Sequence, residues 1–163
     1  MIFRYWFHIL LLISLSAIIG ALIAEYVFNL QPCELCLKQR HPYYFFIMIT
    51  ILTLIILPLH KLLSSFLIQL CAIYGMFYSI WHVGVENGMI KGPSGCSTGL
   101  TISSNTTDLK EQILNKQVVS CDEVIWTLFG ISAATINTLL LLFIFVINGL
   151  YLFKLWQKRK KVI

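Results

Sequence analysis

Four of the five cysteines in this chain occupy positions where thiol chemistry is possible. Cys33 and Cys36 form a C-x-x-C motif, and Cys96 and Cys121 lie together in a later polar segment. The fifth, Cys71, lies inside a long apolar stretch, where a small packed side chain is the expected role. The spacing therefore groups four cysteines into two pairs.

The C-x-x-C motif is compatible with zinc binding, haem attachment or redox chemistry. Haem attachment needs a histidine directly after the second cysteine, but Leu37 follows Cys36. The four paired cysteines could in principle hold zinc. However, 24 residues separate Cys96 from Cys121, and no paired zinc knuckles are present. We therefore predict no metal site.

The two pairs differ in what a disulfide bond would achieve. A static bond between Cys96 and Cys121 would restrict the unfolded chain by several kcal/mol, so a bracing role is reasonable there. A bond between Cys33 and Cys36 closes a very short loop and restricts little chain entropy. Because C-x-x-C spacing can lower a thiol pKa, a redox role is favoured for this pair.

The neighbours of Cys36 strengthen the redox interpretation. Lys38 and Arg40 follow within four residues, and Pro32 suits the first position of a helix. Cationic side chains and a helix N-terminus both favour the thiolate, which is the attacking species in disulfide exchange. Pro42 either kinks this helix or precedes a later start.

The composition indicates which class of protein holds these residues in place. The chain has 163 residues, of which 58% are hydrophobic and 12% are charged, with a mean hydropathy of +0.83. A soluble globular domain would carry about a quarter charged residues, and disorder needs low hydrophobicity. Four uncharged windows are each long enough to cross a bilayer as a helix; they are residues 5–24, 41–60, 62–85 and 124–153.

The first and last windows need separate interpretation. The first is longer than the core of a secretory signal, and the following residues 25–28 are not a small-residue cleavage site, so we expect a retained helix. The last is too long for one perpendicular helix. We therefore expect Val124–Gly130 to form a short interfacial helix, with the spanning part beginning near Ala133.

The predicted fold is an all-α membrane protein, a four transmembrane helix bundle in a single integral membrane domain covering residues 1–163. The helices are expected at about 7–26, 42–59, 62–82 and 133–153. Two outer loops, at about 27–41 and 83–132, hold the paired cysteines, and a basic tail covers about 154–163.

The charged residues predict the orientation. The side with both termini would carry seven basic residues and no acidic one, whereas the other side would carry five basic residues and all seven acidic ones. We expect both termini in the cytoplasm of a bacterium and a multi-pass protein of its inner membrane. The cysteine pairs then face the periplasm, where disulfides persist. We interpret the basic run Lys158–Lys161 as an orientation anchor in the lipid bilayer rather than as a site of specific lipid recognition, and we predict no nucleic-acid partner.

Electrons taken up by a dithiol need an acceptor. The chain has no dinucleotide-binding glycine motif, and its loops are too small for a flavin. A lipid quinone is the simplest acceptor, and a fixed cation would stabilise its anion. Arg40 is the candidate, with an interfacial anchor as the alternative role. His82 could bind a quinone oxygen or donate a proton, although a lone histidine at a helix end is more often structural.

These motifs resemble those of a known family. Residues 32–40, Pro-Cys-Glu-Leu-Cys-Leu-Lys-Gln-Arg, resemble the P-C-x-L-C-x-x-x-R signature of the disulfide bond formation protein B (DsbB) family. Residues 92–96 and 121–130 are similar to the second periplasmic loop of that family. The resemblance covers both loops and the four-helix plan. Gln39 departs from it, because some members have an acid there.

The resemblance implies a quinone-dependent membrane thiol oxidase that supports disulfide bond formation. Cys33 and Cys36 would reduce the quinone, ubiquinone or menaquinone, with Arg40 near its ring. Cys96 would be attacked by a reduced periplasmic thioredoxin-fold dithiol protein (DsbA-like), and Cys121 would be the disulfide mate of Cys96. Exchange between the two pairs would then pass electrons inward.

Two alternatives remain at this point. A vitamin K epoxide reductase-like membrane oxidoreductase also carries two cysteine pairs, but its reactive C-x-x-C is expected in the last helix, where this chain has no cysteine. A non-enzymatic membrane protein could use both disulfides simply to brace its outer loops.

Overall fold

The computed structural model describes residues 2–55, 60–93, 120–122, 124, 126–128 and 130–160. Over these residues the chain forms four long helices, which follow the short 3-10 helix η1 (Ile2–Arg4). They are α1 (Trp6–Tyr26), α2 (Glu34–Ile55), α3 (Lys61–Glu86) and α5 (Ala133–Lys160). Cys96 lies outside the described residues.

Three of these helices, α1, α3 and α5, are long and apolar enough to cross a membrane. Helix α2 falls short because its first turns carry Lys38, Gln39, Arg40 and His41, and its described part ends at Ile55. The structure therefore supports an all-helical membrane protein.

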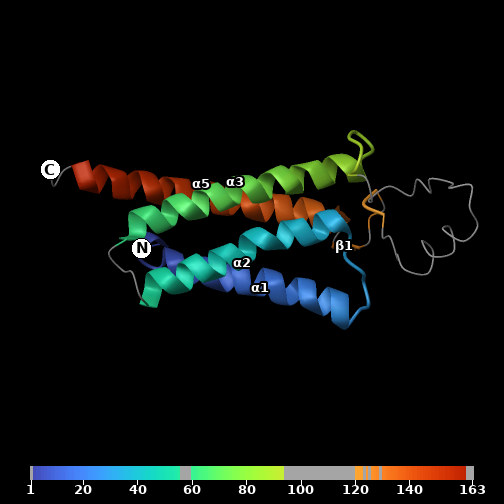
Figure 1. Ribbon diagram of the computed structural model, residues 1–163, viewed down its shortest axis with the longest axis horizontal. Helices are drawn as coiled ribbons and strands as arrows, with labels where there is room; N and C mark the ends of the chain where they lie inside the picture. The colour runs from blue at the N-terminus through green and yellow to red at the C-terminus, as the bar shows by residue number, and fades with distance from the viewer. Residues whose placement is uncertain are drawn as a thin grey trace, which may run out of the picture.

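The helices lie along one another, with α3 packed against both α2 and α5, and with α1 packed against α2. Figure 1 shows η1 and the last turns of α5 at one end, and the start of α2 and the end of α3 at the other. The fully buried core includes Trp6, Leu10, Phe46, Ile68 and Leu141. Such a core holds the bundle together by close packing rather than by exclusion of water.

A buried polar network joins three helices near the η1 end. The indole Nε1 of Trp6 donates to Asn148 Oδ1 at 3.2 Å. Asn148 Nδ2 in turn donates to the carbonyl oxygen of Ser65 and to Oε1 of Gln69, both at 2.8 Å. Hydrogen bonds of this kind between helices fix their register in an apolar surrounding.

Helix α2 starts earlier than predicted. It begins at Glu34 rather than near residue 42, so the first outer loop is shorter than the predicted 27–41, and Pro42 lies inside the helix. The ring of Pro42 faces α3, where Gly75 leaves room for it: a Cβ on Gly75 would lie only 2.7 Å from Pro42 Cγ.

The other helices also extend beyond their predicted bounds. Helix α3 runs to Glu86 rather than residue 82, and α5 runs to Lys160 rather than residue 153. The segment 154–160, which contains four basic residues, therefore belongs to a helix. Lys, Arg and Gln are good helix formers, so the helix continues beyond the apolar region.

The short interfacial helix predicted for Val124–Gly130 is wrong. The described part of this segment contains β1 (Thr127–Leu128), which pairs antiparallel with β2 (Ile131–Ser132). Gly130 has φ +79°, a left-handed conformation that glycine adopts readily and that a helix cannot contain. The glycine therefore makes a hairpin where hydropathy alone suggested a helix.

Candidate active site

The start of α2 brings the two cysteines of the C-x-x-C motif together. Cys33 directly precedes the helix, and the backbone N–H of Leu37 donates to its carbonyl oxygen at 3.1 Å. Cys36 lies in the first turn, where its own N–H donates to Cys33 Sγ at 3.2 Å. Both are free thiols, and their Sγ atoms are hydrogen-bonded at 2.8 Å. A small movement would bring them to the roughly 2.05 Å of a disulfide bond.

His82, near the end of α3, contacts the first of these cysteines. Its Nε2 lies 3.6 Å from Cys33 Sγ, and the ring is buried. On the other side of the ring, Gln39 Nε2 lies 2.8 Å from Nδ1. Because an amide nitrogen can only donate, Nδ1 accepts this bond, and the proton of the neutral ring is on Nε2. His82 therefore directs a donor towards Cys33.

Asn137 and Tyr43 orient the side chain of Gln39 through a chain of hydrogen bonds. Asn137 of α5 donates from Nδ2 to Gln39 Oε1 at 2.8 Å and to Ser79 Oγ at 3.1 Å. The hydroxyl of Tyr43 donates to Asn137 Oδ1 at 2.5 Å. Each donor points to the next acceptor, so the amide of Gln39 presents its nitrogen to His82.

No motif in the sequence marks this chain of residues as functional. The available signal was the presence of polar side chains within apolar helices, since such residues in a membrane protein usually have a function. Asn137 lies within the uncharged window 124–153, and Gln39 was noted only as a departure from the family signature.

The surroundings of Cys33 favour its thiolate. The hydrogen bond to Cys36 lowers the pKa of Cys33 well below that of an ordinary thiol, in opposition to burial, and the hydrogen bond from His82 lowers it further. The sequence predicted two other causes, a helix N-terminus and nearby cations. The backbone N–H of Cys36 at the start of α2 contributes in the way that a helix N-terminus should. Lys38 is paired with Glu34 at 2.8 Å, so its charge is largely compensated within α2.

Arg40 forms an ion pair that the sequence did not reveal. Its Nη1 lies 2.5 Å from Oε2 of Glu25 near the end of α1, and the two side chains are only 14% and 19% exposed. A guanidinium has five N–H donors, so one contact leaves others available. Arg40 is thus held in place by α1 and still borders the cavity described next.

A cavity of about 330 Å³ lies beside Cys36, between α1 and α5. Gln39, Arg40 and His82 also line it, so its polar side carries the predicted cation and histidine. Most of the remaining wall is small or apolar; it includes Ala17, Gly20, Ala21, Ala24, Ala133, Ala134 and Leu140. Such a space suits a flat apolar ring with polar oxygens. Of the two cysteines in the motif, only Cys36 borders it.

Cys121 lies on the other side of the motif. It is buried and disulfide-bonded, and it shares a buried cluster with Cys33, Leu35 and Val85. Cys71 is a free thiol packed against the main core, in agreement with the role expected from its position. Cys36 also packs against the cluster of Cys33 and Cys121, so both cysteines of the motif lie near the second disulfide, and Cys36 additionally borders the cavity.

Three groups at this site could approach a metal ion. The ligand atoms of Cys33, Cys36 and His82 all lie within 4.8 Å of one another. A structural zinc site usually has four protein ligands. In addition, the hydrogen bond from Gln39 leaves the proton on the histidine nitrogen that faces the sulfurs, where a metal would need a lone pair. The arrangement is better suited to thiol chemistry.

Comparison with known proteins agrees with this geometry. The family model described as "Disulfide bond formation protein DsbB" matches residues 3–151. The uncharacterized protein RP370 of Rickettsia prowazekii (strain Madrid E) is 32% identical over 147 residues, which cover 89% of this chain and 85% of that protein. No solved structure matches the chain. The matched residues include all four long helices up to Tyr151.

Proposed function

This chain belongs to the DsbB family, and from that premise we propose that it oxidises a periplasmic dithiol protein and passes the electrons to a membrane quinone. Family membership and three membrane-capable helices already make it a membrane thiol oxidoreductase of disulfide formation. One observation supports the finer assignment: Cys36 borders a cavity, and Cys33 shares a buried cluster with the disulfide-bonded Cys121. The family match favours this function over both the vitamin K epoxide reductase-like and the non-enzymatic alternatives.

The proposed topology has four crossings in one membrane domain, with α2 as the second. Basic residues at the end that holds η1 and the tail of α5 favour the cytoplasm for both termini. The cysteine end then faces the periplasm, as expected for a protein of the bacterial inner membrane. There a thioredoxin-fold dithiol protein, similar to DsbA, can reach the outer cysteines.

The outer pair reacts with this partner. We assign Cys96 as the mate of Cys121, which is supported by the free thiols of the other three cysteines. A thiolate of the partner attacks the sulfur of Cys96, which releases the thiolate of Cys121 and forms a mixed disulfide. The second thiol of the partner then displaces Cys96, so the partner leaves oxidised and the outer pair is reduced.

The inner pair takes up these two electrons. The thiolate of Cys121 attacks Cys33 in the Cys33–Cys36 disulfide, and Cys36 leaves as a thiolate. Cys96 then attacks Cys121 and displaces Cys33, which restores the outer disulfide and leaves a reduced inner pair. The shared cluster of Cys33 and Cys121 supports this order, and His82 stabilises Cys33 as the leaving thiolate.

The cavity beside Cys36 fits a quinone by its size and lining. A bound quinone, ubiquinone or menaquinone, supplies the capacity to accept two electrons and two protons. Cys36 presents its sulfur to the cavity, and Cys33 lies 2.8 Å behind it, ready to close the disulfide. Arg40 offers its remaining donors to an oxygen that gains negative charge. A direct contact of His82 with the quinone stays a prediction, since its Nε2 faces Cys33.

Trapping of the mixed disulfide tests this function. In cells that carry Cys121→Ala, the thiolate of Cys96 attacks the disulfide of an oxidised periplasmic thiol protein, which forms a mixed disulfide and releases one thiolate of that protein. Because Cys121 is absent and cannot resolve this bond, the covalent complex should accumulate. Cys71→Ala is the matched control, because Cys71 is packed in the core and should give no complex. A Cys121→Ala variant that forms no complex, or one that survives the added change Cys96→Ala, would contradict the proposal.

A further inference from the structure

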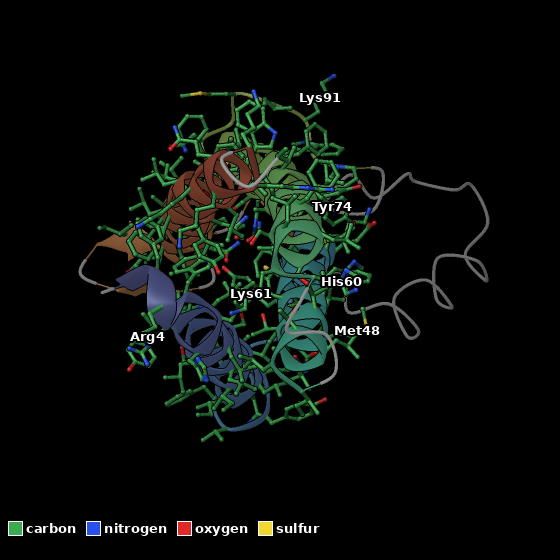
Figure 2. The ribbon with its side chains drawn as sticks, turned by 90° about the vertical axis from the view of Figure 1, so that its left-hand side faces the viewer. Arg4, Met48, His60, Lys61, Tyr74 and Lys91 are labelled. Carbon is green, nitrogen blue, oxygen red and sulfur yellow. The ribbon has the colours of Figure 1, made fainter. Side chains whose placement is uncertain are left out.

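A second cavity, of about 570 Å³, lies at the opposite end of the bundle from the cysteines. Residues of η1, α1, α2, α3 and α5 line it, so it lies where all four long helices come together. Its lining includes four cations and a histidine, namely Arg4, Lys61, Lys154, Lys158 and His8. Figure 2 looks at this end along the helices, with Arg4 beside η1 and α1, and Lys61 between the helices.

No carboxylate compensates these charges. The sequence has seven acidic residues, and none of them lies within residues 1–24, 35–85 or 124–163, which supply all the lining. Among the described residues, the ion pairs all lie at the cysteine end and involve none of the four cations. Lys154 Nζ lies 4.8 Å from the centre of the Phe3 ring, a contact that holds the charge near the cavity without neutralising it.

The walls of this cavity combine apolar surface with a free hydroxyl. Phe7, Leu54 and Leu155 supply apolar side chains. Tyr151 is only 7% exposed, lines the cavity, and has no hydrogen-bond partner for its hydroxyl among the residues that the structure describes. The hydroxyl oxygen is not among the buried polar atoms that lack a partner, so it is accessible from the cavity and can donate to a bound group. The cavity therefore offers an anion both charge and a hydrogen-bond donor, next to apolar walls.

We propose that this cavity binds the phosphate headgroup of an anionic phospholipid, with the acyl chains of the lipid along the apolar helix surface. Basic pockets between membrane helices bind anionic lipid headgroups. Each lysine or arginine near the headgroup contributes a similar amount to the free energy of binding. The convergence of four cations from separate elements distinguishes this site from a basic tail that only meets the membrane surface. The proposal does not depend on the redox function, since the cysteines lie at the other end.

Native mass spectrometry of the full chain in detergent tests this site. Phosphatidylglycerol is the probe, and phosphatidylcholine with the same acyl chains is the zwitterionic comparison. We expect Lys61→Gln and Lys154→Gln each to weaken phosphatidylglycerol binding about fivefold. The matched controls Arg159→Gln and Lys160→Gln remove the same charge from the same end but do not line this cavity, and they should leave binding nearly unchanged.

A second variant changes no charge, and its melting temperature shows whether the protein still folds normally. Tyr151→Phe removes only the unpartnered hydroxyl, so we expect about fivefold weaker lipid binding with an unchanged melting temperature of the lipid-free protein. The proposal would be overturned by equal binding of phosphatidylcholine, by equal losses in the cavity and control variants, or by displacement of the lipid by millimolar inorganic phosphate.

Discussion

Cys33 and Cys36 lie three residues apart but have different neighbours. Cys33 contacts His82 and belongs to a buried cluster with Cys121. Cys36 packs against that cluster and, unlike Cys33, also borders the cavity between α1 and α5. The two sulfurs, 2.8 Å apart, thus connect a second disulfide to a space suited to an apolar electron acceptor. This difference gives the C-x-x-C motif a direction for electron transfer.

The hydrogen bond from Gln39 to His82 should control the thiolate of Cys33. In Gln39→Leu, Nδ1 loses its donor and Nε2 need no longer carry the proton, so the pKa of Cys33 should rise. In Gln39→Glu, a carboxylate favours a proton on Nδ1 and a cationic ring, so the pKa of Cys33 should fall. The shift should be about 0.7 pH unit, which corresponds to a hydrogen bond worth about 1 kcal/mol.

The measurement is a pH titration of thiolate absorbance in the reduced protein, with Cys33→Ser subtracted. A lowered pKa means that the thiolate is retained as the pH falls below the range of an ordinary thiol. Gln69→Leu is a control, because Gln69 bonds to Asn148 and lies outside this chain of residues. Equal midpoints in the wild type and both Gln39 variants would show that the amide does not orient the histidine.

The sequence predicted the reacting cysteines, but it did not predict which distant residues contact the groups of the site. The motif indicated the two cysteines, and the structure brings together the predicted Cys33, Cys36, Arg40 and His82 around one site. The partners Glu25 and Asn137 lie 15 and 98 residues away from the groups they contact. Only the packing of helices brings such residues together, and no local pattern encodes it.

The position of α2 depends on one close contact between helices. Pro42 lies within α2, and Gly75 faces its ring from α3. The absence of a side chain at Gly75 lets the two helices approach, which holds the first turn of α2 and its cysteines near the end of α3. Small residues commonly allow such approach between membrane helices.

Gly75→Ala should destabilise the protein through this contact. The added methyl would lie 2.7 Å from Pro42 Cγ and 3.2 Å from Leu141 Cδ1, and a proline ring cannot rotate away. We expect a loss of about 1–3 kcal/mol in the free energy of unfolding, measured as a lower melting temperature in detergent.

Gly20→Ala is the matched control for this variant. A Cβ at Gly20 meets no atom within 4 Å, and the residue is in the middle of α1. Its melting temperature should therefore be unchanged or slightly higher, because alanine favours a helix more than glycine does. Equal melting temperatures for Gly75→Ala and the wild type would contradict the role of the contact.

Hydropathy predicted the helices better than their ends. Three apolar windows correspond to α1, α3 and α5, because long apolar segments in a membrane protein have few alternatives to a helix. The early start of α2 and the hairpin at Thr127–Ser132 were not predicted. Both depend on single residues, a proline accommodated by a neighbouring glycine and a glycine with positive φ.

In the molecule as a whole, each end of the bundle combines contacts between helices with a cavity, the basic one near η1 and the one between α1 and α5 near the cysteines. Near η1, Trp6 bonds to Asn148, and Phe7 packs edge-on against Tyr151 with ring centres 5.7 Å apart. Near the cysteines, small residues of α1 and α5 face the cavity instead. The contacts near η1 therefore hold the helices together at a distance from the space next to Cys36.

Filling this cavity should impair the acceptor step alone. Ala21→Leu places a larger side chain in the cavity wall, so the KM for added quinone should rise about tenfold, as expected for an overpacking cost of about 1.4 kcal/mol. Exchange with the reduced protein partner should be unaffected. Leu22→Phe, on the exposed side of the same helix, is the control. Equal KM values for both variants would argue against a quinone in this cavity.

The central claim is that Cys36 delivers electrons from the dithiol pair to a quinone. The most direct measurement is turnover of the purified full chain with a reduced thioredoxin-fold protein and added quinone. We predict one quinone reduced for each partner disulfide formed, and loss of quinone reduction in Cys36→Ser. Unchanged quinone reduction in Cys36→Ser, or partner oxidation without consumption of quinone, would contradict the account.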